Sequence, residues 1–223
     1  EKPCQIAQPP KETPSIILKP VEVQLNEPNM LLLDMAEYSV DGAAWQPLEE
    51  ILRIDNIVRK SLNIPPRRKE VLQPYLIEPE TPNHFLRLRF SVPSDIEIPA
   101  AYLGLEDVEH TQIIWNAERI IPEVKGWFVD RSIQKISLPG IHKGQNLLEI
   151  RVPIGRRTNL EAFYLLGDFG VRIKGVEKRI VAPVRKLGFG DVVHQGLPFY
   201  TGNVDYSFDV QVVNRLWIRV PQY

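Results

Sequence analysis

The chain has 223 residues and a mass of 25.6 kDa, and its 27 Lys and Arg nearly balance its 28 Asp and Glu. This balance, with a pI near 6.5, argues against a nucleic-acid-binding protein, because phosphate contacts need a basic excess. A single cysteine, Cys4, excludes an internal disulfide and a multi-cysteine metal site. No apolar run approaches the ~20 residues that cross a bilayer, so we expect neither a nucleic acid nor a membrane as partner.

Composition favours strands over helices. Val and Ile together number 43 whereas Ala numbers 9, and β-branched side chains pack better on a pleated sheet than on a helix. The 20 prolines divide the chain into short elements, because proline fits neither a central strand nor a helix interior. The sequence therefore predicts a mainly β protein, an antiparallel jelly-roll β-sandwich with one N-terminal amphipathic helix.

Residues 1–80 are predicted to form an extended linker followed by a strand-helix connector. Residues 1–20 contain five prolines and no sustained period, which indicates a linker. Residues 30–36 predict one buried strand, and Asp41-Gly42 predicts a tight turn with positive φ at both positions. Residues 47–63 predict the helix, which begins at Pro47 and has one apolar face made of Leu48, Ile51, Ile54, Val58 and Leu62.

Beyond residue 80 the hydrophobic period changes to two. Leu86, Leu88, Phe90 and Val92 alternate with polar residues, which predicts a strand with one solvent-exposed face. Further strands are expected at 101–106, 111–115, 133–138, 146–152, 163–173, 204–213 and 215–220. We assign residues 81–183 to one sandwich. Residues 184–223 either complete that sandwich or open a second, truncated domain.

The acidic residues and histidines do not predict a catalytic or metal site. Glycosidases use two carboxyl groups about 5–9 Å apart, whereas Asp34 and Glu37 would point to opposite faces of one strand, and so would Glu161 and Asp168. The four histidines are widely spaced. Sandwiches of this kind often hold a structural calcium, but no loop here is dense enough in acids to single one out. We therefore expect no catalytic residue, no cofactor and no defined metal ligand.

Aromatic residues beside Gly, Pro or Asp are the better functional lead. A loop aromatic can stack on the apolar face of a sugar ring while a neighbouring acid, amide or Arg binds its hydroxyl groups. Two combinations fit this chemistry: Trp127 with Asp130 and Arg131, and Tyr200 with Asn203. The alternative is that the loop aromatics plug the ends of the sandwich or its junction with a neighbour, and this applies to Trp45, Trp127, Phe128, Phe199 and Tyr200.

Two stretches of sequence resemble known families. The order of elements in IIWNAERI (113–120), WFVDRSIQKISLPGIHKGQNLLEIRVP (127–153) and LEAFYLLGDFGVRI (160–173) resembles the galactose-binding-like jelly roll, an accessory module of large bacterial glycoside hydrolases. Asn116-Ala117 departs from the Asn-Gly that is frequent there, so we expect another turn geometry. The segment 195–210, QGLPFYTGNVDYSFDV, resembles the opening of the sugar-binding domain of glycoside hydrolase family 2 and rhamnosidase-like enzymes. A second, truncated domain in residues 184–223 would therefore be of the sugar-binding type.

The resemblance implies a non-catalytic β-sandwich region of a larger bacterial glycoside hydrolase, which scaffolds the enzyme and contributes to glycan binding. The expected partners are then a glycan and the catalytic domain of the same parent chain, against which residues 30–63 would pack as a connector. The opening Glu1-Lys2-Pro3-Cys4, without an initiator Met or apolar leader, agrees with a processed chain or a piece of a longer one. A free-standing carbohydrate-binding module or lectin, and a protein-interaction β-sandwich, are the alternatives. The compartment stays open between cytoplasm, periplasm and exterior.

Overall fold

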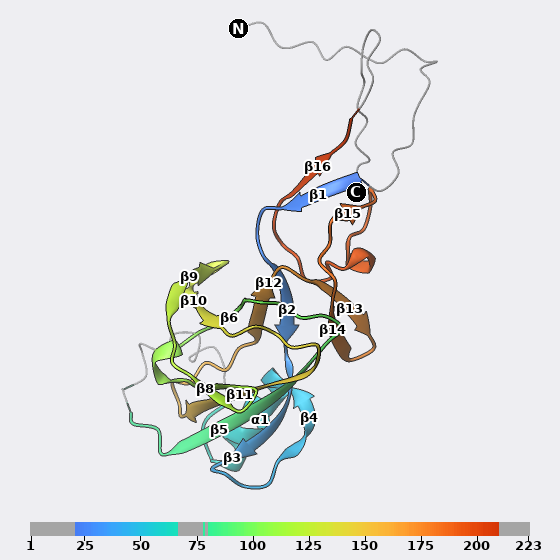
Figure 1. Cartoon of the computed structure of the whole chain (residues 1–223). Helices are drawn as coiled ribbons and strands as arrows, with labels where there is room; N and C mark the ends of the chain where they lie inside the picture. Colours follow the sequence, from blue (N-terminus) through green and yellow to red (C-terminus); the bar gives the residue numbers. More distant parts are fainter. Residues whose placement is uncertain (1–20, 67–77, 79, 210–223) are drawn as a thin grey trace, which may run out of the picture.

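The computed structural model describes residues 21–66, 78 and 80–209, which form two large β-sheets, a small third sheet and one α-helix (Figure 1). The pairings are antiparallel except for one parallel contact between two strands of the largest sheet. The predicted class, mainly β with antiparallel sheets and one helix, is therefore confirmed. The expected linker 1–20, the strand 215–220 and the end of the expected strand 204–213 lie outside the described residues.

The first large sheet has five strands in the order β2-β12-β6-β10-β9. Their bounds are β2 Asn29–Leu33, β6 Ala101–Leu105, β9 Val124–Phe128, β10 Asp130–Leu138 and β12 Phe163–Gly167. Strand β9 pairs only with β10, so it is an edge of this sheet.

The second large sheet has eight strands, with the path β13-β14-β5-β11-β7-β8 and with β3 and β4 attached beside β5. Their bounds are β3 Met35–Val40, β4 Gln46–Glu50, β5 His84–Ser94, β7 Gln112–Trp115, β8 Glu118–Ile120, β11 Gly144–Ile154, β13 Gly170–Lys174 and β14 Glu177–Val181. Strands β5 and β11 pair over their whole length and form the centre of the sheet.

The hydrophobic core lies between the two large sheets, as expected of a β-sandwich. The alternating residues of β5 that were predicted to face inward are all buried. They contact the opposite sheet directly, because the rings of Phe90 on β5 and Phe163 on β12 meet edge to face with centroids 5.4 Å apart. Burial of each such side chain contributes roughly 1.5–3 kcal/mol to the free energy of folding. This explains why the period-two pattern of apolar residues dictates the fold.

Two segments predicted as single strands each cross from one sheet to the other. The expected strand 30–36 is β2 followed by β3, with Asp34 at the crossing, and the expected strand 163–173 is β12 followed by β13. At the second crossing Asp168 accepts a hydrogen bond from Arg185 on the surface of the protein, whereas the next residue, Phe169, is buried in the hydrophobic core. Both predictions were wrong in the same way, because continuous apolar character does not reveal where a strand changes sheets.

The predicted helix is confirmed, but it begins four residues later than expected. Helix α1 spans Ile51–Ser61, whereas Pro47 and Leu48 belong to strand β4, which pairs with β3. The Glu50 carboxylate caps the helix by accepting hydrogen bonds from the backbone N–H groups of Leu52 and Arg53, both at 3.0 Å. The residues expected to form the first turn of the helix therefore pair with β3 as a strand instead, and Leu48 is half exposed.

Two hairpin turns carry paired residues with positive φ. Asp41 and Gly42 have φ of 51° and 78°, which confirms the predicted tight turn. Asn116 and Ala117, between β7 and β8, have φ of 50° and 68°, and the flanking Trp115 and Glu118 are paired. The expectation of another geometry for Asn-Ala was therefore wrong: Ala117 occupies the left-handed position that glycine usually fills, because the two-residue connection requires it.

Replacing Ala117 by Gly is expected to raise the free energy of unfolding by about 0.5–1 kcal/mol. A non-glycine residue in the left-handed region costs ~1–2 kcal/mol, part of which is offset by the larger entropy of unfolded glycine. Urea unfolding monitored by tryptophan fluorescence measures the change. Ala43→Gly is the matched control, since Ala43 lies just after the other turn without positive φ and its replacement should destabilise. Equal destabilisation by both variants would contradict the account.

The third sheet has three strands in the order β15-β1-β16 and stands apart from the sandwich body (Figure 1). Its strands are β1 Val21–Leu25, β15 Lys186–Leu187 and β16 Val204–Ser207. The described strands of the 184–223 region thus pair with β1. The expected connector supplies β2 and β3, which pair with β12 and β5 in the two large sheets. Two stretches of chain therefore connect the small sheet to the body: β1 continues into β2, and β13 and β14 continue into β15.

Candidate functional site

A groove between the sandwich and the loop before β16 is the candidate functional site, and we call it the aromatic groove. Its volume is about 510 Å³, and it is lined by Glu27, Pro28, Met30, Trp127, Phe128, Val129, Lys135, Tyr200, Thr201 and Gly202. Two other hollows of similar size lie beside β13–β14 and beside β7–β8, and no Trp, Tyr or Phe of the described residues lines either of them. The aromatic groove alone among the three combines ring faces with polar groups.

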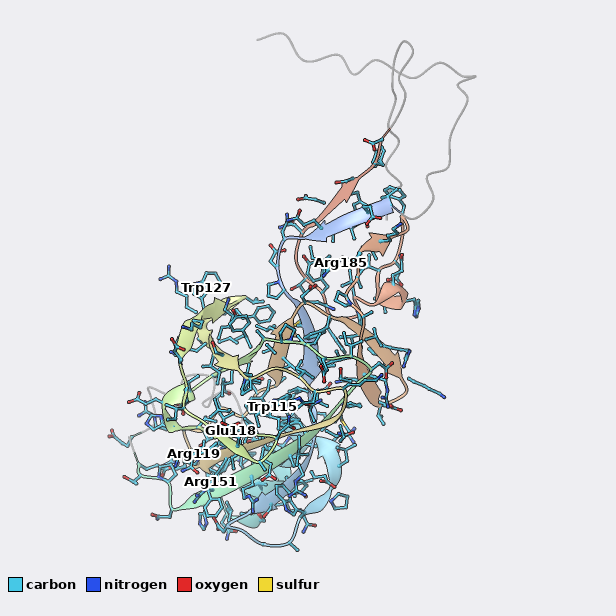
Figure 2. The ribbon with its side chains drawn as sticks, in the orientation of Figure 1. Trp115, Glu118, Arg119, Trp127, Arg151 and Arg185 are labelled. Carbon is cyan, nitrogen blue, oxygen red and sulfur yellow. The ribbon has the colours of Figure 1, made fainter. Side chains whose placement is uncertain are left out.

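One wall of the aromatic groove is the edge strand β9. Trp127 is 56% exposed and projects from the edge of the sandwich (Figure 2). Phe128 is half-buried and packs on Tyr164 of β12, with ring centroids 5.5 Å apart. Trp127 and Phe128 therefore lie in a strand, not in the loop expected from the sequence, and pairing with β10 positions their backbone.

The other wall is the loop 196–203, whose sequence explains its path. Gly196 has φ of 93°, and its carbonyl accepts a hydrogen bond from the backbone N–H of Val171 at 2.8 Å. Leu197 is buried, and Phe199 packs against the core. The Gly-x-Pro-x-Tyr-x-Gly run thus anchors the loop to the body before the chain reaches Tyr200, so that Tyr200 faces the groove.

Glu27 ties this loop to the end of β1. Its carboxylate accepts hydrogen bonds from the backbone N–H of Asn203 at 2.7 Å and from the Asn203 side-chain amide at 3.3 Å. The Tyr200 hydroxyl lies 3.0 Å from the same carboxylate and 2.6 Å from the Asn203 carbonyl, and its one proton can serve either acceptor. A Cβ on Gly202 would lie 2.5 Å from the Tyr200 hydroxyl and closer still to a Glu27 carboxylate oxygen, so a larger residue there would displace these two side chains from their present contact.

These hydrogen bonds also set the charge state of the loop. The Asn203 backbone N–H first, and then the Tyr200 hydroxyl, lower the pKa of Glu27 below its ordinary value, so the carboxylate stays ionised through the weakly acidic range. Burial raises the pKa of Tyr200, so its hydroxyl stays protonated. The groove therefore presents a fixed carboxylate and a neutral phenol over a wide pH range.

The structure brings some of the predicted site residues together and separates others. Trp127 and Tyr200 were predicted in two independent combinations, and both line the same groove. Asn203 does not line it but donates a hydrogen bond from its backbone N–H to Glu27. Asp130 and Arg131 are exposed and do not line it. Asp130 instead accepts hydrogen bonds from the backbone N–H and hydroxyl of Ser132, both at 2.8 Å, and the Ser132 backbone N–H is the main cause of its lowered pKa.

Sequence reasoning missed Glu27, Lys135 and Gly202. Glu27 is one acid in a proline-flanked turn, and only the pairing of β1 with β16 brings it to Tyr200. Lys135 falls in a strand where lysine normally indicates a solvated face. The Gly-x-Pro-x-Tyr-x-Gly run did contain Gly202, but nothing in one sequence says which side chain a glycine must avoid.

Three of the acids considered for catalysis pair with a basic residue. Asp34 binds Lys178 and Glu37 binds Arg89. Asp168 is held by both terminal nitrogens of Arg185, and that bidentate contact lowers its pKa. Across residues 21–66, 78 and 80–209 no group of three or more His, Cys, Asp or Glu side chains could hold a metal ion.

No described helix has both the length and the apolar character needed to span a membrane. Comparisons with protein families, with curated proteins and with solved structures find no match for this chain.

Proposed function

We propose that this chain is a non-catalytic β-sandwich region of a larger bacterial glycoside hydrolase, and that its aromatic groove contributes to glycan binding. The observation that carries the proposal is the convergence of Trp127 and Tyr200, far apart in the sequence, on one groove with polar groups at its rim. A sugar ring offers an apolar C–H face to an aromatic ring and hydroxyl groups to hydrogen-bonding side chains, so this arrangement suits it.

Three side chains of the groove suit different parts of a sugar. Trp127 is exposed enough to receive a ring face. Tyr200 and Glu27 already hold one another, and their remaining lone pairs can accept hydrogen bonds from sugar hydroxyls. Because these groups are fixed before binding, little conformational entropy is lost when a glycan enters. The galactose-binding-like sequence pattern over residues 113–173 supports the same reading.

Trp127→Ala is expected to weaken glycan binding by about 30-fold or more, from a micromolar-to-millimolar dissociation constant. An aromatic anchor at the centre of a binding surface commonly contributes ~2 kcal/mol or more. A glycan array identifies a ligand for the full chain, and isothermal titration calorimetry then measures the affinity of each variant.

Trp45→Ala is the matched control for this experiment. Trp45 lies on the outer face of the other sheet, under the guanidinium groups of Arg87 and Arg89 at 4.7 and 3.8 Å, so its loss should leave glycan affinity unchanged. An equal loss in both variants, or no glycan bound by the unaltered chain, would contradict the groove assignment. Turnover of aryl-glycosides that one carboxylate substitution abolishes would contradict the non-catalytic role.

A protein-interaction β-sandwich is the second candidate function. It is favoured by exposed apolar side chains along the edge formed by β8 and β9, namely Ile121, Val124 and Val129. Such a role predicts binding to a partner protein and none to glycans. The catalytic domain of the same parent chain is the partner that the resemblance suggests.

A further inference from the structure

Lys135 is a cation without a carboxylate partner inside the aromatic groove. It extends from β10, is half-buried, and its ammonium lies 4.9 Å from the centre of the Tyr102 ring. Among the described residues no Asp or Glu forms an ion pair with it. Lys178 offers a contrast: it also lies over a ring, that of Phe199, but it is paired with Asp34.

The other charged residue of the groove does not neutralise Lys135. The Glu27 carboxylate is directed to the Asn203 backbone N–H, the Asn203 amide and the Tyr200 hydroxyl, and no ion pair joins it to Lys135. Lys135 is half-buried as a residue and its ammonium lies against the Tyr102 ring, and a cation–π contact offsets only part of the hydration that an ammonium loses at such a place. The groove is therefore complementary to an anionic group placed next to Lys135.

We propose that the glycan bound in the aromatic groove carries a carboxylate, as in a uronic acid, with the carboxylate on Lys135 and the sugar ring on Trp127. This inference rests on the proposed function, since it names the class of sugar for the same groove. A charge-assisted hydrogen bond between ammonium and carboxylate is about twice as strong as a neutral one, and partial burial protects it from salt. Trp127 provides affinity for sugars in general, and Lys135 provides the preference for an acidic one.

The experiment compares an α-1,4-linked galacturonic acid trimer with its methyl ester, which has the same sugar rings and linkages, one added methyl group per carboxyl and no charge. Isothermal titration calorimetry on the full chain at low ionic strength should give about tenfold tighter binding of the acid than of the ester. Lys135→Met should bring the affinity for the acid down to that for the ester, whereas Lys135→Arg should keep the preference. Thermal unfolding of each variant shows that the fold is retained.

Lys125→Met is the matched control, because Lys125 lies on the same hairpin but is exposed and paired with Glu123 outside the groove. It should leave the preference intact. Equal affinity for acid and ester, binding of neutral glycans only, or a preference that survives Lys135→Met would each overturn the inference while the proposed function stands. If the chain binds no glycan of any kind, both are overturned.

Discussion

Replacing Arg59 by Met is expected to lower the free energy of unfolding by about 3–5 kcal/mol. Arg59 and Asp55 lie one turn apart on α1 and are almost fully buried, with the Arg59 Nε 2.9 Å from both carboxylate oxygens. The guanidinium also donates to the carbonyl oxygens of Pro65 and Thr158, which joins the helix to the segment after β11. Its loss would leave a buried carboxylate without its counter-charge and two carbonyl groups without a donor.

Urea unfolding of Arg59→Met and of the exposed control Arg53→Met measures this effect. Arg53 pairs with Glu49 at the helix surface, and its loss should change the free energy of unfolding by less than about 0.5 kcal/mol. The double variant Asp55→Leu with Arg59→Met should recover much of the lost stability, because no buried charge remains. Similar destabilisation by Arg53→Met and Arg59→Met would show that the buried pair is not what fixes the helix.

Replacing Asn146 by Ala is expected to cost about 3 kcal/mol, through hydrogen bonds rather than charge. Asn146 is fully buried at the start of β11. Its oxygen accepts from the Asn116 amide and the His142 backbone N–H, both at 2.9 Å, while its amide donates to the carbonyl oxygens of His142 and Val92 at 2.7 and 3.3 Å. Each buried donor or acceptor left without a partner costs ~1–3 kcal/mol, with partial relaxation.

Gln145→Ala serves as the control for Asn146→Ala, since the neighbouring Gln145 side chain is exposed and bonds Ser91 at the surface. Thermal unfolding should show a large fall in midpoint for Asn146→Ala and a small one for Gln145→Ala. Hydrogen exchange should also become faster at Leu147, whose backbone N–H donates to Asn116. Equal midpoints for the two variants would mean that the network contributes little.

The period of hydrophobic residues could predict most of the fold, because burial against a facing sheet acts on every second residue. It placed β5, β6, β7 and β11 within a few residues of their observed bounds. It could not place the crossings at Asp34 and Asp168, nor the start of α1, because these depend on which strand pairs with which. Pairing partners are set by tertiary contacts that leave no local pattern.

The candidate site could be predicted only in part, for a similar reason. Trp127 and Tyr200 were identifiable because each aromatic residue stands in a stretch with Gly, Pro or Asp, which is less typical of a buried strand. Their polar neighbours in space, Glu27 and Lys135, come from the turn after β1 and from β10, and not from the adjacent positions Asp130 and Arg131. A residue that is close to Trp127 in the sequence need not be close to it in space, and where two sheets meet the neighbours in space come from other strands and turns.

The bond between Glu27 and the Tyr200–Asn203 segment has a consequence for the order of assembly. It joins the opposite ends of the described chain, so it forms only after the largest loop has closed, and contacts of such separation are made late in folding. No described strand pair within the two large sheets includes Glu27 or the loop 196–203, so the sandwich core can be complete while this wall is still missing. Under the proposed function, the aromatic groove would then become able to bind a glycan only in the last step of folding. It would also lose that ability first when the small sheet detaches.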